Sequence, residues 1–225
     1  MLIQVETSQE SIATAPGYGR MKRFLDVVLT LLLLIPLSIV MLIVALAIRL
    51  DSEGPIFFRQ RRVGLNGVEF NMFKFRSMYH RCDDTLHREA IARYMANETV
   101  NGDASTNLHY KQIDDPRVTR VGRFIRKMSF DELPQFFNIL RGEMTLVGPR
   151  PPLPYEVEIY TEHDKLRLCG RPGLTGVWQV YGRSQVPFHE MVEMDIDYLQ
   201  QQSILQDLKL IVLTIPVMVL GRGGA

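Results

Sequence analysis

The chain has 225 residues, with 26 lysines and arginines against 25 aspartates and glutamates and a formal net charge of +1. This length suffices for one domain with a real hydrophobic core plus an appendage, because typical domains contain about 100 to 150 residues. The near-neutral charge excludes a uniformly basic nucleic-acid-binding protein, so we expect no nucleic-acid partner. Cys82 and Cys169 lack metal-ligand spacing, which indicates reduced thiols in a cytosol-facing protein.

Residues 1–20 mix small and polar residues with few large apolar ones, which predicts a flexible N-terminal tail. The chain then carries almost no charge between Asp26 and Arg49, in the run FLDVVLTLLLLIPLSIVMLIVALAIRL. As a straight helix, roughly 22 apolar residues reach about 33 Å, enough to cross the hydrocarbon core of a bilayer. The run is too long for a cleavable signal, and no small-residue cleavage site follows it. We therefore expect residues 21–50 to form a membrane-inserted helix.

Two features of this run bear on whether it spans the membrane or re-enters the same face. Pro36 lies near its middle, where the missing N–H and the clash of its ring with the carbonyl of Leu32 predict a bend. Positive charges flank both ends of the run, at Arg20, Lys22 and Arg23 before it and at Arg49, Arg59, Arg61 and Arg62 after it. Since positive flanks are typical of the cytoplasmic side, this symmetry favours a re-entrant helix, and a spanning helix stays open as the alternative.

Residues 51–225 are expected to form a compact cytosolic domain of α+β class, mostly helical. The pair Asn66-Gly67 separates two alternating, aromatic-rich runs, which is the strongest short hairpin signal in the chain. We therefore predict a small antiparallel β-hairpin near the membrane. Residues 79–113 begin with a helical pattern and end in a polar stretch, which indicates a variable excursion.

The rest of the chain predicts short helices separated by loops. Apolar residues recur at helical spacing after residue 130, and residues 187–202 have the pattern of a helix. The stretch RPGLTGVWQVYGR predicts loop and short extended chain. The C-terminal apolar segment is too short to span a membrane and contains Pro216, so the membrane interface and the core fit it equally well.

Asp131 and Glu132 lie side by side in the stretch RKMSFDELPQ. In a structural interpretation, Ser129 and Glu132 form a capping box at a helix N-terminus. Pro134 then falls at the fifth helical position, where its missing N–H costs a hydrogen bond. Moving the cap to Asp131 places Pro134 in the first turn but leaves Glu132 without a capping role. Helix capping therefore explains one of the two acids at most.

The acidic pair stands among many cations: Arg117, Arg120, Arg123, Arg126, Lys127, Arg141, Arg150, Arg171 and Arg183. The last three lie in GPRPP, GRPGLTG and VYGRS, where Gly and Pro fix the loop geometry and let backbone approach a ligand. Guanidinium groups on such loops suit phosphate oxygens. A carboxylate pair beside them predicts Mg²⁺, which uses one or two carboxylates plus substrate phosphates. Phosphoryl transfer next to a membrane is the chemistry that fits.

Several ordered motifs together resemble the bacterial sugar transferases, monotopic phosphoglycosyl transferases that initiate exopolysaccharide and O-antigen assembly. They are KRFLD, GPIFFRQRRVG, KFRSM, DPRVTRVGRFIRKMSFDELPQ, NILRGEMTLVGPRPP and RPGLTGVWQVYGR. The resemblance implies an enzyme at the cytoplasmic face of the bacterial inner membrane, in its minimal catalytic form, with residues 51–225 as the catalytic domain. It implies transfer of a sugar 1-phosphate from a UDP-sugar to undecaprenyl phosphate, with Mg²⁺ as cofactor and UMP as product.

The resemblance also implies roles for individual residues. Asp131 would be the nucleophile that attacks the sugar-linked phosphorus and forms an acyl-phosphate intermediate, and Glu132 beside it would help to hold Mg²⁺. An ionised carboxylate needs no base for this attack, and the metal reduces its repulsion from the diphosphate. The positions that match phosphate-contacting residues are Lys74, Arg126, Arg150 and Arg183. Weaker candidates for substrate binding, for which a fold-supporting role is equally open, are Arg76, Arg171 and Gln179.

Some features of the chain keep alternatives open. Ile35 precedes Pro36 where relatives commonly have Ser, which leaves open how the bend is stabilised, and Ser184 stands where Asn is frequent, which leaves its role open. Trp178 favours a plain hexose such as glucose or galactose, with an N-acetylhexosamine 1-phosphate transferase as the alternative enzyme. Outside enzymes, the alternative is a membrane-anchored scaffold that binds anionic lipid heads, against which the acidic pair counts. Membrane lipids are expected partners, and a homodimer is expected on general grounds only.

Overall fold

The computed structural model describes residues 17–80, 115–182 and 186–219, together with Glu89, Ala92, Tyr94 and Met95. In this part of the chain the protein is mostly helical and carries two small sheets of two strands each. Residues 1–16 of the expected tail, most of the excursion over residues 79–113, and Arg183 and Ser184 lie outside the described residues.

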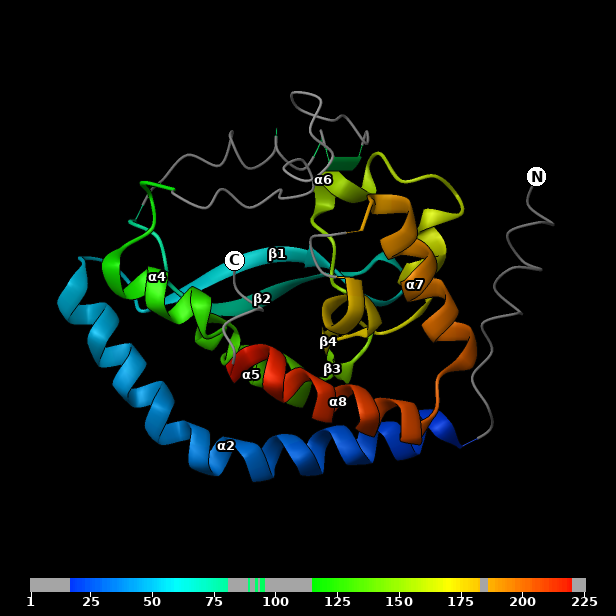
Figure 1. Ribbon diagram of the computed structural model, residues 1–225, viewed down its shortest axis with the longest axis horizontal. Helices are drawn as coiled ribbons and strands as arrows, with labels where there is room; N and C mark the ends of the chain where they lie inside the picture. Colours follow the sequence, from blue (N-terminus) through cyan, green and yellow to red (C-terminus); the bar gives the residue numbers. More distant parts are fainter. Residues whose placement is uncertain are drawn as a thin grey trace.

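The chain begins with one long apolar helix, α2 (Tyr18–Asp51), the lower arc in Figure 1. The helix starts at Tyr18, three residues before the predicted start at residue 21. The residue before it, Gly17, has a φ of 91°, a left-handed conformation that cannot belong to the helix. Among the described residues, α2 is the helix that is long and apolar enough to cross a membrane by length and composition. The mean hydropathy of its most apolar window is 3.1, and 17% of that window is buried.

Pro36 lies inside α2, and the helix continues past it without interruption. In Figure 1, α2 is a curved arc rather than two separate helices. The hydroxyl of Ser38 donates a hydrogen bond to the carbonyl oxygen of Ile35 at 2.7 Å. Such serine bonds to a preceding carbonyl often accompany helix bending, and so does the missing N–H of proline. The sequence predicts a bend at Pro36, and the structure has one continuous helix that passes through this residue.

The β-hairpin predicted from Asn66-Gly67 is confirmed. Strands β1 (Phe57–Val63) and β2 (Glu69–Phe75) pair antiparallel, and the turn η1 (Leu65–Gly67) joins them. Asn66 and Gly67 have φ values of 55° and 80°, the left-handed conformation that the tight turn requires and that these two residues adopt at low cost.

Two short helices follow, as the sequence pattern predicted. α4 (Arg120–Lys127) starts at Thr119, whose hydroxyl oxygen accepts a hydrogen bond from the Gly122 N–H at 2.9 Å. α5 (Gln135–Arg141) ends at Gly142, whose φ of 81° gives a left-handed C-cap. Ile125 of α4 and Ile139 of α5 are 1% and 0% exposed, so both helices bury an apolar face in the core.

The second sheet was not predicted. Strands β3 (Thr145–Val147) and β4 (Gly173–Thr175) pair in parallel, with α6 (Pro154–Val157) and η3 (Asp164–Cys169) between them in the chain. β4 confirms the short extended chain expected in the stretch RPGLTGVWQVYGR, whereas the later part of that stretch forms a π-helical turn, η4 (Trp178–Gly182), in place of loop. Pairs of three-residue strands leave too little sequence pattern to be recognised from a single chain.

The last two helices are α7 (Phe188–Gln201), which confirms the helix predicted over residues 187–202, and α8 (Ile204–Val219). α8 lies alongside the first half of α2 (Figure 1). It buries Leu210, which is 1% exposed, and leaves Leu205 and Val212 79% and 62% exposed. The C-terminal segment thus contributes to the core on one face and to the surface on the other.

The first half of α2 is fastened to the rest of the domain by polar side chains. Arg23 donates to the carbonyl oxygen of Ile139, at the end of α5, at 2.6 Å. Asp26, buried within the fold, accepts hydrogen bonds from the Thr145 hydroxyl at 2.5 Å and the Leu146 N–H at 3.1 Å. These contacts fix the beginning of α2 against α5 and β3.

The other end of α2 is fastened to the same domain. Ile48 is 2% exposed and belongs to the hydrophobic core. The Asp51 carboxylate accepts a hydrogen bond from the Val121 N–H of α4 at 3.1 Å, and Arg76 donates to the Ser52 carbonyl oxygen at 2.7 Å. Both ends of the apolar helix are therefore held by one folded domain.

Between these two ends, α2 presents large apolar side chains to the surface: Leu31, Leu32, Leu33, Ile35, Ile39, Leu42 and Ile43. α8, which contacts α2, also exposes large apolar side chains at Leu205, Leu208, Val212 and Ile215. An apolar surface of this extent is typical of a site of contact with a membrane or a partner.

Candidate functional site

The acidic pair lies on a short 3-10 turn, η2 (Phe130–Glu132), between α4 and α5, and both side chains are half-buried. Ser129 precedes the turn with φ 56° and ψ 20°, a left-handed conformation that a non-glycine residue adopts only at a cost. The N-cap of α5 is Pro134, and Ser129 makes no side-chain cap bond. α5 therefore begins at Gln135, later than a cap at Ser129 or at Asp131 would place it.

Lys74 of β2 contacts the acidic turn. Its Nζ lies 3.0 Å from Oε1 of Glu132, and the two side chains are 20% and 40% exposed. A partly exposed pair of this kind adds little to stability. It does place a cation directly beside the acidic pair, so the structure brings Lys74 and Glu132 together.

Arg126 lies half-buried in the last turn of α4, just before the acidic turn. The start of this segment is anchored by Asp115, which forms an ion pair with Arg117 at 2.7 Å. The hydrogen bond from the Arg117 side chain lowers the pKa of Asp115 below its ordinary value of 3.8, and the charge of Arg126 acts in the same direction. Arg126, just before the acidic turn in the chain, thus also favours the charged form of Asp115.

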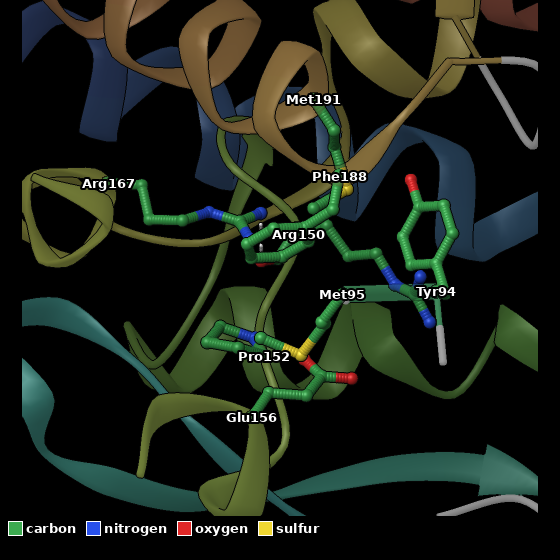
Figure 2. Close-up of a pocket in the computed structure, with 8 residues that line it drawn as sticks. All are labelled: Tyr94, Met95, Arg150, Pro152, Glu156, Arg167, Phe188 and Met191. Atoms are coloured by element: carbon green, nitrogen blue, oxygen red, sulfur yellow. Dashed lines mark hydrogen bonds between the residues drawn. The ribbon is translucent and has the colours of Figure 1, made fainter. Parts of the chain in front are cut away.

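Arg150 belongs to a second group of residues. Its guanidinium lies 5.5 Å from the ring centre of Trp178, in a cation–π arrangement. It lines a pocket of about 330 Å³, counting the part open to solvent, whose walls come from the Arg150 loop, α6, η3, α7 and the described residues Tyr94 and Met95. Figure 2 shows Arg150 extending along the pocket toward Tyr94, with Arg167 on the opposite side.

Arg167 was missed by the sequence analysis. Its side chain is 2% exposed, and it forms an ion pair with Asp195 of α7 and a 2.9 Å hydrogen bond to the Tyr160 hydroxyl. Burial raises the pKa of Tyr160 to about 12, so this hydroxyl stays protonated. The sequence did carry one signal, an arginine between two leucines in LRLCG, which indicates a buried charge that needs a partner. The partner itself could not be identified from the sequence, because Asp195 lies 28 residues farther along the chain.

The three weaker candidates have different surroundings. Arg76 is 5% exposed, and its guanidinium donates to the carbonyl oxygens of Glu53 and Ser52 at 2.9 and 2.7 Å, beyond the end of α2. These contacts fit the fold-supporting role that the sequence left open for Arg76. Arg171 is half-buried at the entry to β4. Gln179, also half-buried, donates to the Leu174 carbonyl oxygen at 3.4 Å, and its side-chain oxygen is buried without a hydrogen-bond partner among the described residues.

The hairpin relates the two groups of site residues. Lys74 stands opposite Phe58 and contacts the acidic turn, whereas Arg62, opposite Phe70, donates to the carbonyl oxygen of Pro151 at 2.8 Å. Positions 58 and 62 of one strand are about 13 Å apart, at roughly 3.3 Å per residue. The acidic turn and the Arg150 loop therefore dock at different points along one ribbon. Arg183, the remaining candidate, lies outside the described residues.

The residues at the acidic turn suit a divalent cation that binds only one or two protein side chains. The described residues contain no cluster of three or more His, Cys, Asp or Glu side chains that could enclose a metal. Asp131 and Glu132 offer two neighbouring carboxylates. Mg²⁺ fits such a donor set, since it usually takes one or two carboxylates and completes its shell with water and substrate phosphates.

Comparison with known proteins gives consistent matches over nearly the whole chain. The family model described as bacterial sugar transferase matches residues 17–221. The galactosyl transferase CpsE of Streptococcus agalactiae serotype III is 44% identical over 204 residues, which are 90% of this chain and 43% of that protein. The exopolysaccharide production protein ExoY of Sinorhizobium fredii is 42% identical over 216 residues, which are 96% of this chain and 93% of that protein.

A third relative is named for its reaction. The undecaprenyl-phosphate galactose phosphotransferase of Salmonella typhimurium is 38% identical over 205 residues, which are 91% of this chain and 41% of that protein. The chain thus spans less than half the length of two of these relatives and nearly all of the third. The match extends far beyond the acidic turn and confirms the family indicated by the sequence motifs. The chain belongs to the bacterial sugar transferase family.

Proposed function

We propose that this protein transfers a sugar 1-phosphate, from a UDP-sugar, to undecaprenyl phosphate and thereby starts the assembly of an exopolysaccharide or O-antigen. The observation that carries the proposal is the half-buried acidic turn of Asp131 and Glu132, with the Lys74 cation 3.0 Å from Glu132. Relatives named as undecaprenyl-phosphate galactose and glucose phosphotransferases support the same reaction.

In the first step, a carboxylate oxygen of Asp131 attacks the sugar-linked phosphorus of the donor. A new oxygen–phosphorus bond forms, and the bond from that phosphorus to the bridging oxygen breaks. UMP leaves with the bridging oxygen and its electron pair, and the sugar phosphate stays on the enzyme as an acyl phosphate. An ionised carboxylate is already a nucleophile, so this step needs no general base.

In the second step, a phosphate oxygen of undecaprenyl phosphate attacks the same phosphorus. The acyl-phosphate bond breaks, its electrons return to the Asp131 carboxylate, and the sugar is now linked to the lipid through a diphosphate. The acceptor oxygen is ionised at neutral pH, so no proton has to be removed. Two displacements at one phosphorus regenerate the free enzyme.

Cationic side chains of the site balance the charge of the donor. Lys74 and Arg126, near the acidic turn, would contact the phosphates of the donor, since ammonium and guanidinium groups stabilise the charge that develops during phosphoryl transfer. Arg150, farther along the hairpin, would hold another phosphate oxygen of the same elongated ligand, and we retain Arg171, Gln179 and Arg183 as weaker candidates. Asp131 and Glu132 would hold Mg²⁺, which when bound neutralises phosphate charge.

Helices α2 and α8 support a membrane arrangement that we propose as part of this function. We propose that α2 enters the cytoplasmic leaflet of the inner membrane and returns to the same face, and that the exposed side of α8 lies at the interface. Because Asp26 and Asp51 at the two ends of α2 bond to one domain, a transmembrane path would have to pull one end away from its partners. The exposed apolar middle of the helix supports insertion at that point.

The sugar is proposed to be a hexose. Trp178 and the names of the relatives, among them a galactosyl transferase and a glucose phosphotransferase, support glucose or galactose over an N-acetylhexosamine. A scaffold without turnover would not need two adjacent carboxylates where anionic lipid heads bind, because acids repel such heads in the absence of a metal.

The proposal is tested by incubating purified protein with Mg²⁺, undecaprenyl phosphate and each of four donors: UDP-glucose, UDP-galactose, UDP-N-acetylglucosamine and UDP-N-acetylgalactosamine. UMP release is then measured. Release with a UDP-hexose that requires the lipid acceptor supports the proposal. Release with the N-acetylated donors alone would identify the alternative enzyme, and no release with any donor would favour the scaffold.

A further inference from the structure

The loop that carries Arg150 has an unusual backbone. Its sequence from residue 149 is Pro-Arg-Pro-Pro, so three of these four residues have no N–H, and the loop is held chiefly through its carbonyl oxygens.

Each of the four carbonyl oxygens accepts a hydrogen bond. The carbonyl of Pro149 accepts from the Gly173 N–H at 2.8 Å, and that of Pro152 accepts from the Val63 N–H at 2.9 Å. Between them, Arg62 donates to the carbonyl of Pro151 at 2.8 Å. Arg167 donates to the carbonyl of Arg150 itself at 3.2 Å. The two central anchors are therefore guanidinium groups from β1 and η3.

Both of these guanidinium groups are buried, at 3% exposure for Arg62 and 2% for Arg167. Each is in turn oriented by other side chains: Arg62 by the amide oxygen of Gln60 at 2.8 Å, and Arg167 by Asp195 and the Tyr160 hydroxyl. Burying a charged group costs free energy, and well-packed apolar residues often stabilise a fold as much or more. A buried arginine does fix the direction of its hydrogen bonds, because the planar guanidinium holds its N–H donors in a rigid geometry.

We propose that Arg62 and Arg167 are positioning residues that hold the Pro149–Pro152 loop so that the Arg150 guanidinium stays over Trp178 and faces the substrate phosphate. The assignment of a phosphate contact to Arg150 rests on the proposed function. The position of the Arg150 guanidinium over Trp178 depends only on the loop and its anchors, and it can be measured without substrate turnover.

Trp178 provides the readout, since it is the only tryptophan of the 225 residues and the Arg150 guanidinium lies 5.5 Å from its ring. The variants Arg62→Lys and Arg167→Lys keep the charge and lose the planar fork. Each is made in the wild-type chain and in an Arg150→Ala background. The matched control is Arg61→Lys, the neighbouring residue on the same strand, whose side chain is 73% exposed.

We expect both positioning variants to shift the tryptophan emission toward that of Arg150→Ala, and to change it no further in the Arg150→Ala background. In kinetics with a UDP-sugar, the KM should rise about tenfold in the wild-type chain, the scale of a lost charged contact, with kcat changed less. In the Arg150→Ala background the same substitutions should change the KM less than about twofold. Arg61→Lys should leave emission and KM unchanged.

Emission shifts of equal size in both backgrounds would show a general structural effect and overturn the proposal, and so would unchanged emission in both variants. Arg62→Lys alone decides the matter if Arg167→Lys fails to fold. An absence of UMP release by the wild-type protein would count against the proposed function, while the fluorescence comparison would still decide whether the two arginines position Arg150.

Discussion

The Lys74 Nζ lies 3.0 Å from the Glu132 Oε1, which joins a cation on β2 to the acidic turn between α4 and α5. The pair is formed by residues 58 positions apart in the chain, so it exists only once the hairpin has docked on the turn. It brings a positive charge from a distant part of the chain to the acidic pair. A cation held at this point can balance both the carboxylates and an incoming diphosphate.

Removing the Lys74 charge should therefore weaken donor binding more than it weakens folding. We expect Lys74→Met to raise the KM for the UDP-sugar about tenfold, the scale of one lost charged contact, and Lys74→Arg to retain part of the affinity. Initial rates of UMP release over a range of donor concentrations measure this. The matched control is Lys165→Met, which removes an exposed ion pair with Glu162 elsewhere on the surface. An equal effect in both variants would contradict a site-specific role.

Glu132 should matter through the metal. Glu132→Gln keeps the size of the side chain but removes one of the two carboxylate charges, so we expect the Mg²⁺ concentration for half-maximal UMP release to rise by about tenfold or more. A titration with Mg²⁺ at saturating donor measures it. Glu69→Gln, which removes a surface acid paired with Arg61, should leave the titration unchanged. A normal Mg²⁺ requirement in Glu132→Gln would remove this residue from the metal site.

Both ends of α2 should be accessible from one side of the membrane. Single cysteines are placed by Gly19→Cys at the beginning of α2, Glu53→Cys after its end and Glu158→Cys on the domain, in a background in which Cys82 and Cys169 are serine. All three positions are exposed, and a side chain at Gly19 meets open space. We expect all three to react with a membrane-impermeant thiol reagent only after the cells are opened. Labelling of Gly19→Cys in intact cells would establish a spanning helix.

The Asp115 carboxylate should stabilise the protein in a pH-dependent way. Because the hydrogen bond from Arg117 lowers its pKa below 3.8, the contribution is fully present above that value and is lost as the pH falls through the lower pKa of the folded state. At pH 7, Asp115→Asn should therefore lower the free energy of unfolding by about 2 kcal/mol. Thermal unfolding in detergent at neutral pH and near pH 3.5 measures the difference, which should narrow in acid. The control is Asp197→Asn, an exposed aspartate on α7, which should leave the free energy of unfolding at pH 7 nearly unchanged.

Structural features that depend only on neighbouring residues in the chain were predictable. Asn66-Gly67 specifies its hairpin, because few other pairs adopt two successive left-handed conformations. Pro134 limits where α5 can begin, and the helix starts at the next residue, Gln135. The acidic pair could be singled out because capping accounted for at most one of the two carboxylates.

Features that depend on distant partners were not predictable in the same way. Arg76 and Arg150 both follow loop or strand motifs, yet one closes the end of α2 and the other lies over Trp178. Nothing local distinguishes the two arginines, because the difference comes from which carbonyl groups and rings the fold brings near them. The anchoring of the Arg150 loop by Arg167 likewise requires α7 to supply Asp195 from the far end of the domain.

The central claim, that Asp131 carries the sugar phosphate, is tested most directly by the intact mass of the protein after incubation with a UDP-hexose and Mg²⁺ in the absence of lipid acceptor. We expect the wild-type protein and the exposed control Asp197→Asn to gain the mass of one hexose 1-phosphate less one water, and the adduct to disappear when undecaprenyl phosphate is added. Asp131→Asn should fold normally and show no adduct. An adduct of the same mass on Asp131→Asn, or UMP release at the wild-type rate by that variant, would contradict the account.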